Sequence, residues 1–175
     1  MWLEDAGMIY RVFNISKPAM PLSAYKETTA FKVYASDCGL LRRLANLPAS
    51  VVISPVDNYT EFKGAMAENA VLESMMPLFG GEVPCYWTSD ATAEVEFVIQ
   101  WDRFIIPIEV KAAGNISGTS LSVYTKKYHP EYRVRFSTLN FQYNCGLLSS
   151  PSPLAAWFYR LFSLLPPASP NDTPL

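Results

Sequence analysis

Hydrophobic and polar residues alternate most clearly in the middle of the chain. Residues 93–101 and 104–111 each have the pattern of a β-strand, and Asp102-Arg103 between them predicts the two-residue turn of a β-hairpin. With that turn, residues whose numbers sum to 205 face each other, so Glu96 lies opposite Glu109 and Glu94 opposite Lys111. Two facing carboxylates repel each other. The pair therefore predicts a cation between them, a bound proton, or full solvation.

The same alternation gives the hairpin two different faces. One face is entirely apolar and is expected to be core; it carries Val95, Phe97, Ile99, Phe104, Ile106, Ile108 and Val110. The other face is apolar near the turn and charged at its far end, where it carries Glu94, Glu96, Glu109 and Lys111. We expect a helix to cover the apolar part of this second face and to leave the charged end open to a ligand.

Helical spacing extends from about residue 61 to residue 79 and ends at Gly80-Gly81. Glu68 projects from the apolar side of this helix, where a carboxylate is costly without a partner. We expect this helix to cover the charged-ended face of the hairpin, which would bring Glu68 to Glu96 and Glu109. Four residues share the stripe: Ala65, Glu68, Leu72 and Met75.

Shorter signals predict the remaining elements. We expect helices at 2–7, 38–44, 117–127 and 154–165, strands at 8–15, 31–35 and 132–138, and a last short strand at Leu148. Asp37 is the expected N-cap of the helix at 38–44. Residues 166–175 offer nothing to pack, and their composition predicts a disordered tail.

Composition fits one main domain. Half of the 175 residues are apolar and 17% are charged, which predicts an apolar surface that meets another molecule. Three widely spaced cysteines, with no Cys-x-x-Cys pair, support neither a disulfide scaffold nor a zinc ribbon and fit a reducing, cytoplasmic location. The apolar run at 154–165 is too short to span a bilayer and is interrupted by Arg160, so no membrane association is expected.

The charge balance limits nucleic-acid binding to a local patch. A net charge of −2 and a pI near 5.4 argue against strong non-specific adhesion of the whole surface to nucleic acid. Phosphate contacts need only a few cations on one face. The alternative, which we favour, is a solvated helix end and strand. The candidate contacts, in the densest basic stretch, are Lys126, Lys127, Arg133 and Arg135.

Several short motifs occur in a characteristic order. They are FKVY at 31–34, DCGLL at 37–41, GAMAEN at 64–69, YWT at 86–88, AEVEFVI at 93–99 and IPIEVK at 106–111. Over roughly residues 28 to 140 this order resembles the domain of unknown function found C-terminal to the motor in many bacterial and archaeal AAA-type ATPases. The resemblance implies an α/β fold of the restriction-endonuclease-like PD-(D/E)xK type, a mixed central β-sheet flanked by helices, over residues 28–165. It also implies that residues 1–27 are the end of a winged helix.

The resemblance places Glu68, Glu96, Glu109 and Lys111 on the active-site positions of that fold. It implies that Glu68, Glu96 and Glu109 hold Mg²⁺ or Mn²⁺, hard ions that prefer oxygen ligands. Glu109 and Lys111 would be the catalytic residues, and Lys111 would assist the water that attacks a phosphodiester of DNA. The family usually has aspartate where this chain has Glu96, and the extra methylene displaces the carboxylate from a rigid octahedral ion.

Three functions remain open from the sequence. The first is a metal-dependent phosphodiesterase acting on DNA, joined to or derived from an ATPase. The second is a non-catalytic interaction or regulatory module that keeps the nuclease fold and docks against the ATPase motor, another protein or nucleic acid. The third is a structural domain that mediates homo-oligomerisation. The chain has no Gly-x-x-x-x-Gly-Lys-[Ser/Thr] motif, so ATP binding is not expected in it.

Overall fold

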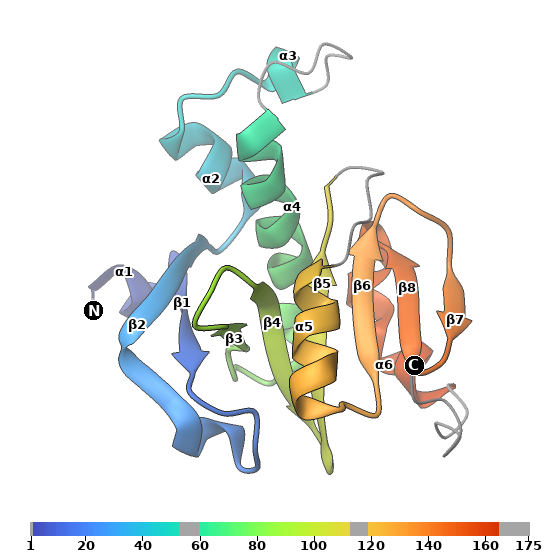
Figure 1. Cartoon of the computed structure of the whole chain (residues 1–175). Helices are drawn as coiled ribbons and strands as arrows, with labels where there is room; N and C mark the ends of the chain where they lie inside the picture. The colour runs from blue at the N-terminus through green and yellow to red at the C-terminus, as the bar shows by residue number, and fades with distance from the viewer. Residues whose placement is uncertain (1, 53–59, 113–118, 165–175) are drawn as a thin grey trace.

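The computed structural model describes residues 2–52, 60–112 and 119–164, and its centre is an eight-stranded mixed sheet (Figure 1). The strand order is β2-β1-β3-β4-β5-β6-β8-β7. The strands are β1 (Ile9–Ile15), β2 (Lys26–Ala35), β3 (Cys85–Thr88), β4 (Glu94–Trp101), β5 (Phe104–Val110), β6 (Arg133–Ser137), β7 (Gln142–Asn144) and β8 (Leu147–Pro151). This architecture confirms the predicted mixed α/β class with helices flanking a central sheet.

Helices cover both faces of the sheet. The α-helices are α1 (Trp2–Asp5), α2 (Cys38–Leu44), α3 (Ala49–Val52), α4 (Thr60–Met75), α5 (Thr119–Tyr128) and α6 (Phe158–Ser163). Three 3₁₀ helices lie at Leu22–Tyr25, Met76–Leu78 and Ser152–Trp157. In the described ranges, no helix has both the length and the apolarity that crossing a membrane requires.

Two apolar clusters fill the space between the sheet and its helices. The larger cluster joins α4 and α6 to one face of the sheet, whereas the smaller one joins α5 to the other face (Figure 1). The larger includes Val71, Leu72, Met75, Phe97, Ile99, Ile106, Ile108, Phe158 and Phe162. The smaller includes Ile15, Leu22, Cys85, Trp87, Val95, Val98 and Tyr124.

The central hairpin has the predicted register. Phe97 pairs with Ile108 and Trp101 with Phe104, so the residue numbers of each pair sum to 205. Asp102 in the turn has a φ of 48°, the left-handed conformation that a tight hairpin connection needs. The length of the turn and the period of two therefore determine this register.

Regular alternation ends where β4 pairs with β3. Cys85 pairs with Val98 and Trp87 with Val95, so three residue steps along β4 oppose two along β3. This β-bulge resets the alternation and turns Val95 into the α5 cluster, away from Phe97. The prediction that Val95 shares a face with Phe97 is therefore wrong.

The helix that carries Glu68 covers the opposite face from the one predicted. Leu72 and Met75 of α4 pack against the face of the hairpin that carries Phe97, Ile106 and Ile108, and α5 covers the face that carries Val98 and Ile105. The apolar stripe of α4 is buried where the sheet offers the most apolar surface. Ala65, which was expected on the buried stripe, is exposed because it lies beyond the edge of this contact.

The other predictions hold to different extents. The helix at 38–44 has its expected bounds, and the Asp37 carboxylate accepts a hydrogen bond from the Leu40 N–H at 2.8 Å. The final helix begins as the 3₁₀ helix at Ser152–Trp157 and continues as α6. Strands β3 and β7 were not predicted. Residues 117 and 118 of the helix predicted at 117–127, and the predicted tail at 166–175, lie outside the described residues.

The segment before residue 28 contributes to the same sheet. β1 pairs antiparallel with β2 and parallel with β3, and β2 itself crosses the expected boundary between residues 27 and 28. Asn69 of α4 also holds β2, since its side-chain oxygen accepts from the Ala35 N–H at 2.9 Å and its amide donates to the Ala35 carbonyl at 3.2 Å. These bonds fix α4 beside the strand that carries Tyr34.

Candidate functional site

Lys111 connects the two facing carboxylates of the central hairpin. Its Nζ lies 3.4 Å from Glu109 Oε1 and 3.9 Å from Glu96 Oε1. Lys111 directly follows β5, and its N–H donates to the Phe136 carbonyl at 2.8 Å, which holds its backbone beside β6. The cation that the facing pair requires is therefore a lysine of the same hairpin.

Glu109 is fully buried and has a second cationic partner. Its Oε2 accepts a hydrogen bond from Arg135 Nε at 2.7 Å, and the two residues are paired neighbours on the parallel strands β5 and β6. Its Oε1 has no hydrogen-bond partner among the described residues, apart from the ion-pair contact with Lys111. Two cations therefore hold the buried carboxylate: Arg135 through a short hydrogen bond, and Lys111 through a longer ion-pair contact.

Glu96 lies in the bulged part of β4 and is 7% exposed. Its Oε2 accepts from the Val110 N–H at 3.2 Å. Burial raises the pKa of Glu96 to about 7, and its hydrogen bonds and Lys111 oppose this rise only in part, while Glu68 adds to it. A substantial fraction of this carboxyl group is therefore protonated near neutral pH.

Glu68 has the partner that its position on the apolar side of α4 requires. The Tyr34 hydroxyl donates to Glu68 Oε2 at 2.8 Å, and Lys32 Nζ lies 3.9 Å from the same oxygen. Burial, and next to it the charge of Glu68, raises the pKa of the Tyr34 hydroxyl, which keeps it a hydrogen-bond donor. Glu68 is therefore held on the α4 face of the sheet.

Glu94 does not form its ion pair with Lys111, although plain hairpin geometry places the two opposite each other. Its carboxylate contacts Lys32 of β2 instead. The reason is the β4 bulge, which changes the direction of the side chains before Phe97. Lys32 thus joins Glu94 to Glu68, as Lys111 joins Glu96 to Glu109.

We call these seven residues the carboxylate–cation cluster. Their four carboxylates are balanced in part by three cations, all supplied by this chain. The members are Lys32, Glu68, Glu94, Glu96, Glu109, Lys111 and Arg135. Sequence reasoning singled out Glu68, Glu94, Glu96, Glu109 and Lys111 for this cluster, but it missed Lys32 and considered Arg135 only as a nucleic-acid contact. Alternation along 132–138 was the one signal that favoured a sheet position for Arg135.

The cluster does not fit a divalent metal ion in this arrangement. Within the part of the chain that the structure describes, no three Asp, Glu, His or Cys side chains form a group that could hold such an ion. Strand alternation turns Glu109 to the α5 face, whereas Glu68 extends from the helix on the other face. Lys111 bridges the two carboxylates that do approach each other. The metal-ligand roles of Glu68, Glu96 and Glu109 stay a prediction.

The basic stretch is partly engaged inside the protein. Arg135 binds Glu109, and Arg133 donates to the Cys145 carbonyl, so both guanidinium groups already have acceptors. Lys127 Nζ lies 5.8 Å from the centre of the Trp87 ring, and Lys126 precedes it at the end of α5. The two lysines are therefore better placed than the two arginines to contact phosphates.

Comparison with known families gives two matches. A family model described as a domain of unknown function (DUF4143) matches residues 63–154, and a second, described as a domain of unknown function (DUF8612), matches residues 1–51. The first match contains most of the cluster, whereas Lys32 and Tyr34 lie in the second. No curated protein and no solved structure matches the chain.

Proposed function

Because the chain belongs to the family described as a domain of unknown function (DUF4143), whose model covers residues 63–154 of its 175, we propose that it is a non-catalytic docking module with a nuclease-like fold. Its partner in this proposal is the motor domain of an AAA-type ATPase. The motif resemblance supports the link to the motor and the winged-helix origin of the first residues. The mixed sheet with helices on both faces supports a PD-(D/E)xK-like fold.

One observation carries the non-catalytic part of the proposal: the cations of the chain itself occupy the candidate active site. A lysine that orients a water molecule needs a free ammonium group, but Lys111 is shared between Glu96 and Glu109. A carboxylate that binds metal needs free oxygens, but Glu109 gives one oxygen to Arg135. Such a network favours a structural role for these charges.

The docking part of the proposal is supported by an apolar surface on the outermost strand pair. Two cross-strand pairs, Arg11–Val33 and Phe13–Phe31, form what we call the β2 face. Val33 is 54% exposed and Phe31 39% exposed, and Arg11 lies over the rings of Phe13 and Phe31 at 5.2 and 5.5 Å. β2 is also an edge strand ten residues long, a position where sheets commonly receive partners.

The wild-type domain is expected to give no saturable heat with Mn²⁺ or Mg²⁺, and to leave single- and double-stranded DNA uncut. The physical reason is that Lys111 and Arg135 hold the carboxylates that a metal would need. Isothermal titration calorimetry at pH 7.5 and a DNA cleavage assay measure the two properties. The variant Glu109→Gln, which removes the buried carboxylate, tests whether any metal binding depends on the cluster. Glu131→Gln, a change at an exposed carboxylate outside the cluster, is its matched control.

A metal-dependent phosphodiesterase acting on DNA is the second candidate function. It is favoured by the buried Glu109 Oε1, because an acceptor without a hydrogen-bond partner is a group that a bound cation would satisfy. Saturable Mn²⁺ binding that Glu109→Gln loses and Glu131→Gln keeps would overturn the non-catalytic proposal in favour of this candidate.

A charge on the β2 face is expected to weaken docking to the motor. Val33→Lys places an ammonium in the apolar patch beside Arg11, and the affinity for an AAA-type motor domain from the same cell should fall at least tenfold, about 1.4 kcal/mol. Calorimetric titration of the motor domain measures this effect. Val123→Lys, at an exposed apolar position of α5, is the control and should bind like the wild type. Equal affinities of both variants would contradict docking through the β2 face.

A further inference from the structure

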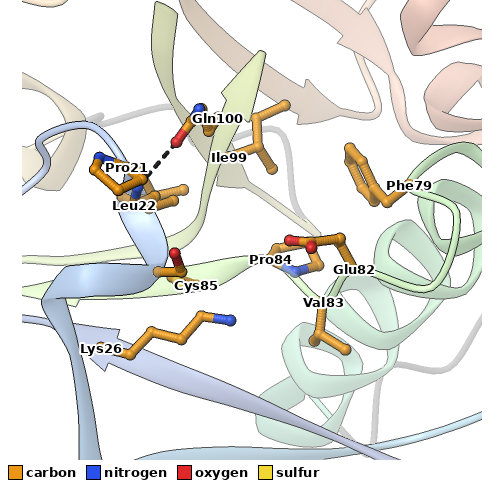
Figure 2. A pocket seen from close by; sticks show the side chains of 12 residues that line it. Pro21, Leu22, Lys26, Phe79, Glu82, Val83, Pro84, Cys85, Ile99 and Gln100 are labelled. Atoms are coloured by element: carbon orange, nitrogen blue, oxygen red, sulfur yellow. Dashed lines mark hydrogen bonds between the residues drawn. The ribbon is translucent and has the colours of Figure 1, made fainter. Parts of the chain in front are cut away.

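A cavity of about 410 Å³ lies beside the start of β3 and the end of β4 (Figure 2). Glu94 and Glu96 of the carboxylate–cation cluster lie toward the other end of β4. Its volume falls within the range of small-molecule sites in proteins. Its lining comes from three segments that are separate in the sequence, namely residues 21–26, 79–85 and 98–100. The cavity is therefore a product of the tertiary fold.

The apolar part of the cavity wall is held in place. The Leu22 N–H donates to Gln100 Oε1 at 2.9 Å, which fixes the 3₁₀ helix at Leu22–Tyr25 against β4. Leu22 and Ile99 are themselves buried core residues. The apolar lining includes Leu22, Phe79, Val83, Pro84 and Ile99. A ligand would thus find a preformed surface for an apolar group.

Two opposite charges line the same cavity without pairing. Lys26 and Glu82 both contribute to its wall, and among the described residues neither forms an ion pair. Figure 2 shows the Lys26 side chain extending past Cys85 toward Val83, and Glu82 beside Pro84. Burial raises the pKa of the Cys85 thiol, Lys26 opposes this rise and Glu82 adds to it, so both charges act on one buried group.

We propose that this cavity binds a zwitterionic amino acid with an apolar side chain. Lys26 holds the carboxylate of the ligand, Glu82 holds its ammonium group, and the apolar side chain packs against Phe79 and Ile99. A simple organic anion fits less well because Glu82 repels it, and a cation fits less well because Lys26 does. A purely apolar molecule leaves both charges without a partner. The proposal does not depend on the docking function.

Three probes with the same phenyl group test the charge requirement. L-Phenylalanine carries both charges, 3-phenylpropionate lacks the ammonium group, and 2-phenylethylamine lacks the carboxylate. In titrations followed by amide chemical shifts in NMR, L-phenylalanine is expected to bind at least tenfold more tightly than either of the others. Equal binding of all three, or no binding of L-phenylalanine up to about 10 mM, overturns the proposal.

Two single changes separate the roles of the charges. Lys26→Gln is expected to weaken binding of L-phenylalanine at least tenfold and to leave binding of 2-phenylethylamine no weaker. Glu82→Gln is expected to weaken L-phenylalanine similarly and to leave 3-phenylpropionate no weaker. Both variants are expected to fold because both positions are at least partly exposed, and thermal unfolding checks this. Unchanged binding of L-phenylalanine by both folded variants overturns the assignment.

Cys85 reports where the ligand binds. Saturating L-phenylalanine is expected to slow the alkylation of Cys85 by iodoacetamide at least threefold, measured by peptide mass spectrometry. Cys145 is exposed and far from the lining segments in the sequence, and its alkylation rate should not change. An unchanged Cys85 rate in the presence of bound L-phenylalanine places the ligand elsewhere and overturns the site.

Discussion

Replacing Arg135 by methionine is expected to lower the free energy of unfolding by about 3 kcal/mol. Glu109 is fully buried and accepts from Arg135 Nε at 2.7 Å. Methionine occupies much of the volume of the arginine stem but leaves the carboxylate with Lys111 as its remaining cation, at 3.4 Å. Most of the loss therefore comes from an incompletely compensated buried charge. Urea denaturation followed by circular dichroism at pH 7.5 measures the effect.

Two further variants make this experiment specific to the charge. Adding Glu109→Gln to Arg135→Met removes the uncompensated carboxylate, and the double variant is expected to recover at least half of the lost stability. Arg43→Met, at an exposed position of α2, should change the free energy of unfolding by no more than about 0.5 kcal/mol. An equally small change in Arg135→Met would mean that the pair stabilises nothing, and would remove the main support for a structural role of the cluster.

The hairpin was predictable because its information is local. A two-residue turn and the period of two fix every partner from Phe97 to Ile108, so the sequence is sufficient for the register. The bulge before Phe97 was not predictable in the same way. It arises where β4 must match β3, and that pairing depends on a four-residue strand with no alternating pattern of its own.

In the candidate site, too, the features that depend on local sequence were predicted and those that depend on contacts between distant segments were not. The position of Glu68 on the apolar side of α4 correctly predicted that this half-buried carboxylate has a partner. The identity of that partner, Tyr34, depends on α4 packing against β2, which is a contact between segments distant in the sequence. The bond from Arg135 to Glu109 likewise depends on β5 and β6 being parallel neighbours. Periodicity within one strand contains no information about which strand lies beside it.

The face that α4 covers was predicted wrongly for a related reason. Both faces of the hairpin carry apolar residues, so either one could receive the apolar stripe of a helix. The sheet extends on both sides of the hairpin, and Val134 and Phe136 of β6 enlarge the apolar surface on the face of Ile106 and Ile108. This larger surface receives α4, since burial of apolar area is the dominant favourable contribution to packing.

Stability is expected to fall as the pH rises from about 4.5 to about 7, through the titration of Glu96. Burial raises the pKa of this carboxyl group from 4.5 in the unfolded chain to about 7 in the folded protein. Between these values the folded state binds more protons than the unfolded state, so each increase in pH favours unfolding. The stabilisation is complete below the lower pKa and is lost above the higher one, a total of about 3 kcal/mol.

The variant Glu96→Gln isolates this contribution from all other titrating groups. The free energy of unfolding of Glu96→Gln minus that of the wild type is expected to increase by about 3 kcal/mol between pH 4.5 and pH 7.5. The wild type loses stability over this range as Glu96 becomes charged, whereas the amide of the variant stays neutral. Urea denaturation at both pH values measures the difference, and Glu131→Gln, a change at an exposed carboxylate outside the cluster, is the matched control. A constant difference for Glu96→Gln would mean that Lys111 keeps Glu96 charged at neutral pH. A charged Glu96 beside Glu109 would favour cation binding, and the phosphodiesterase would then become the stronger of the two candidate functions.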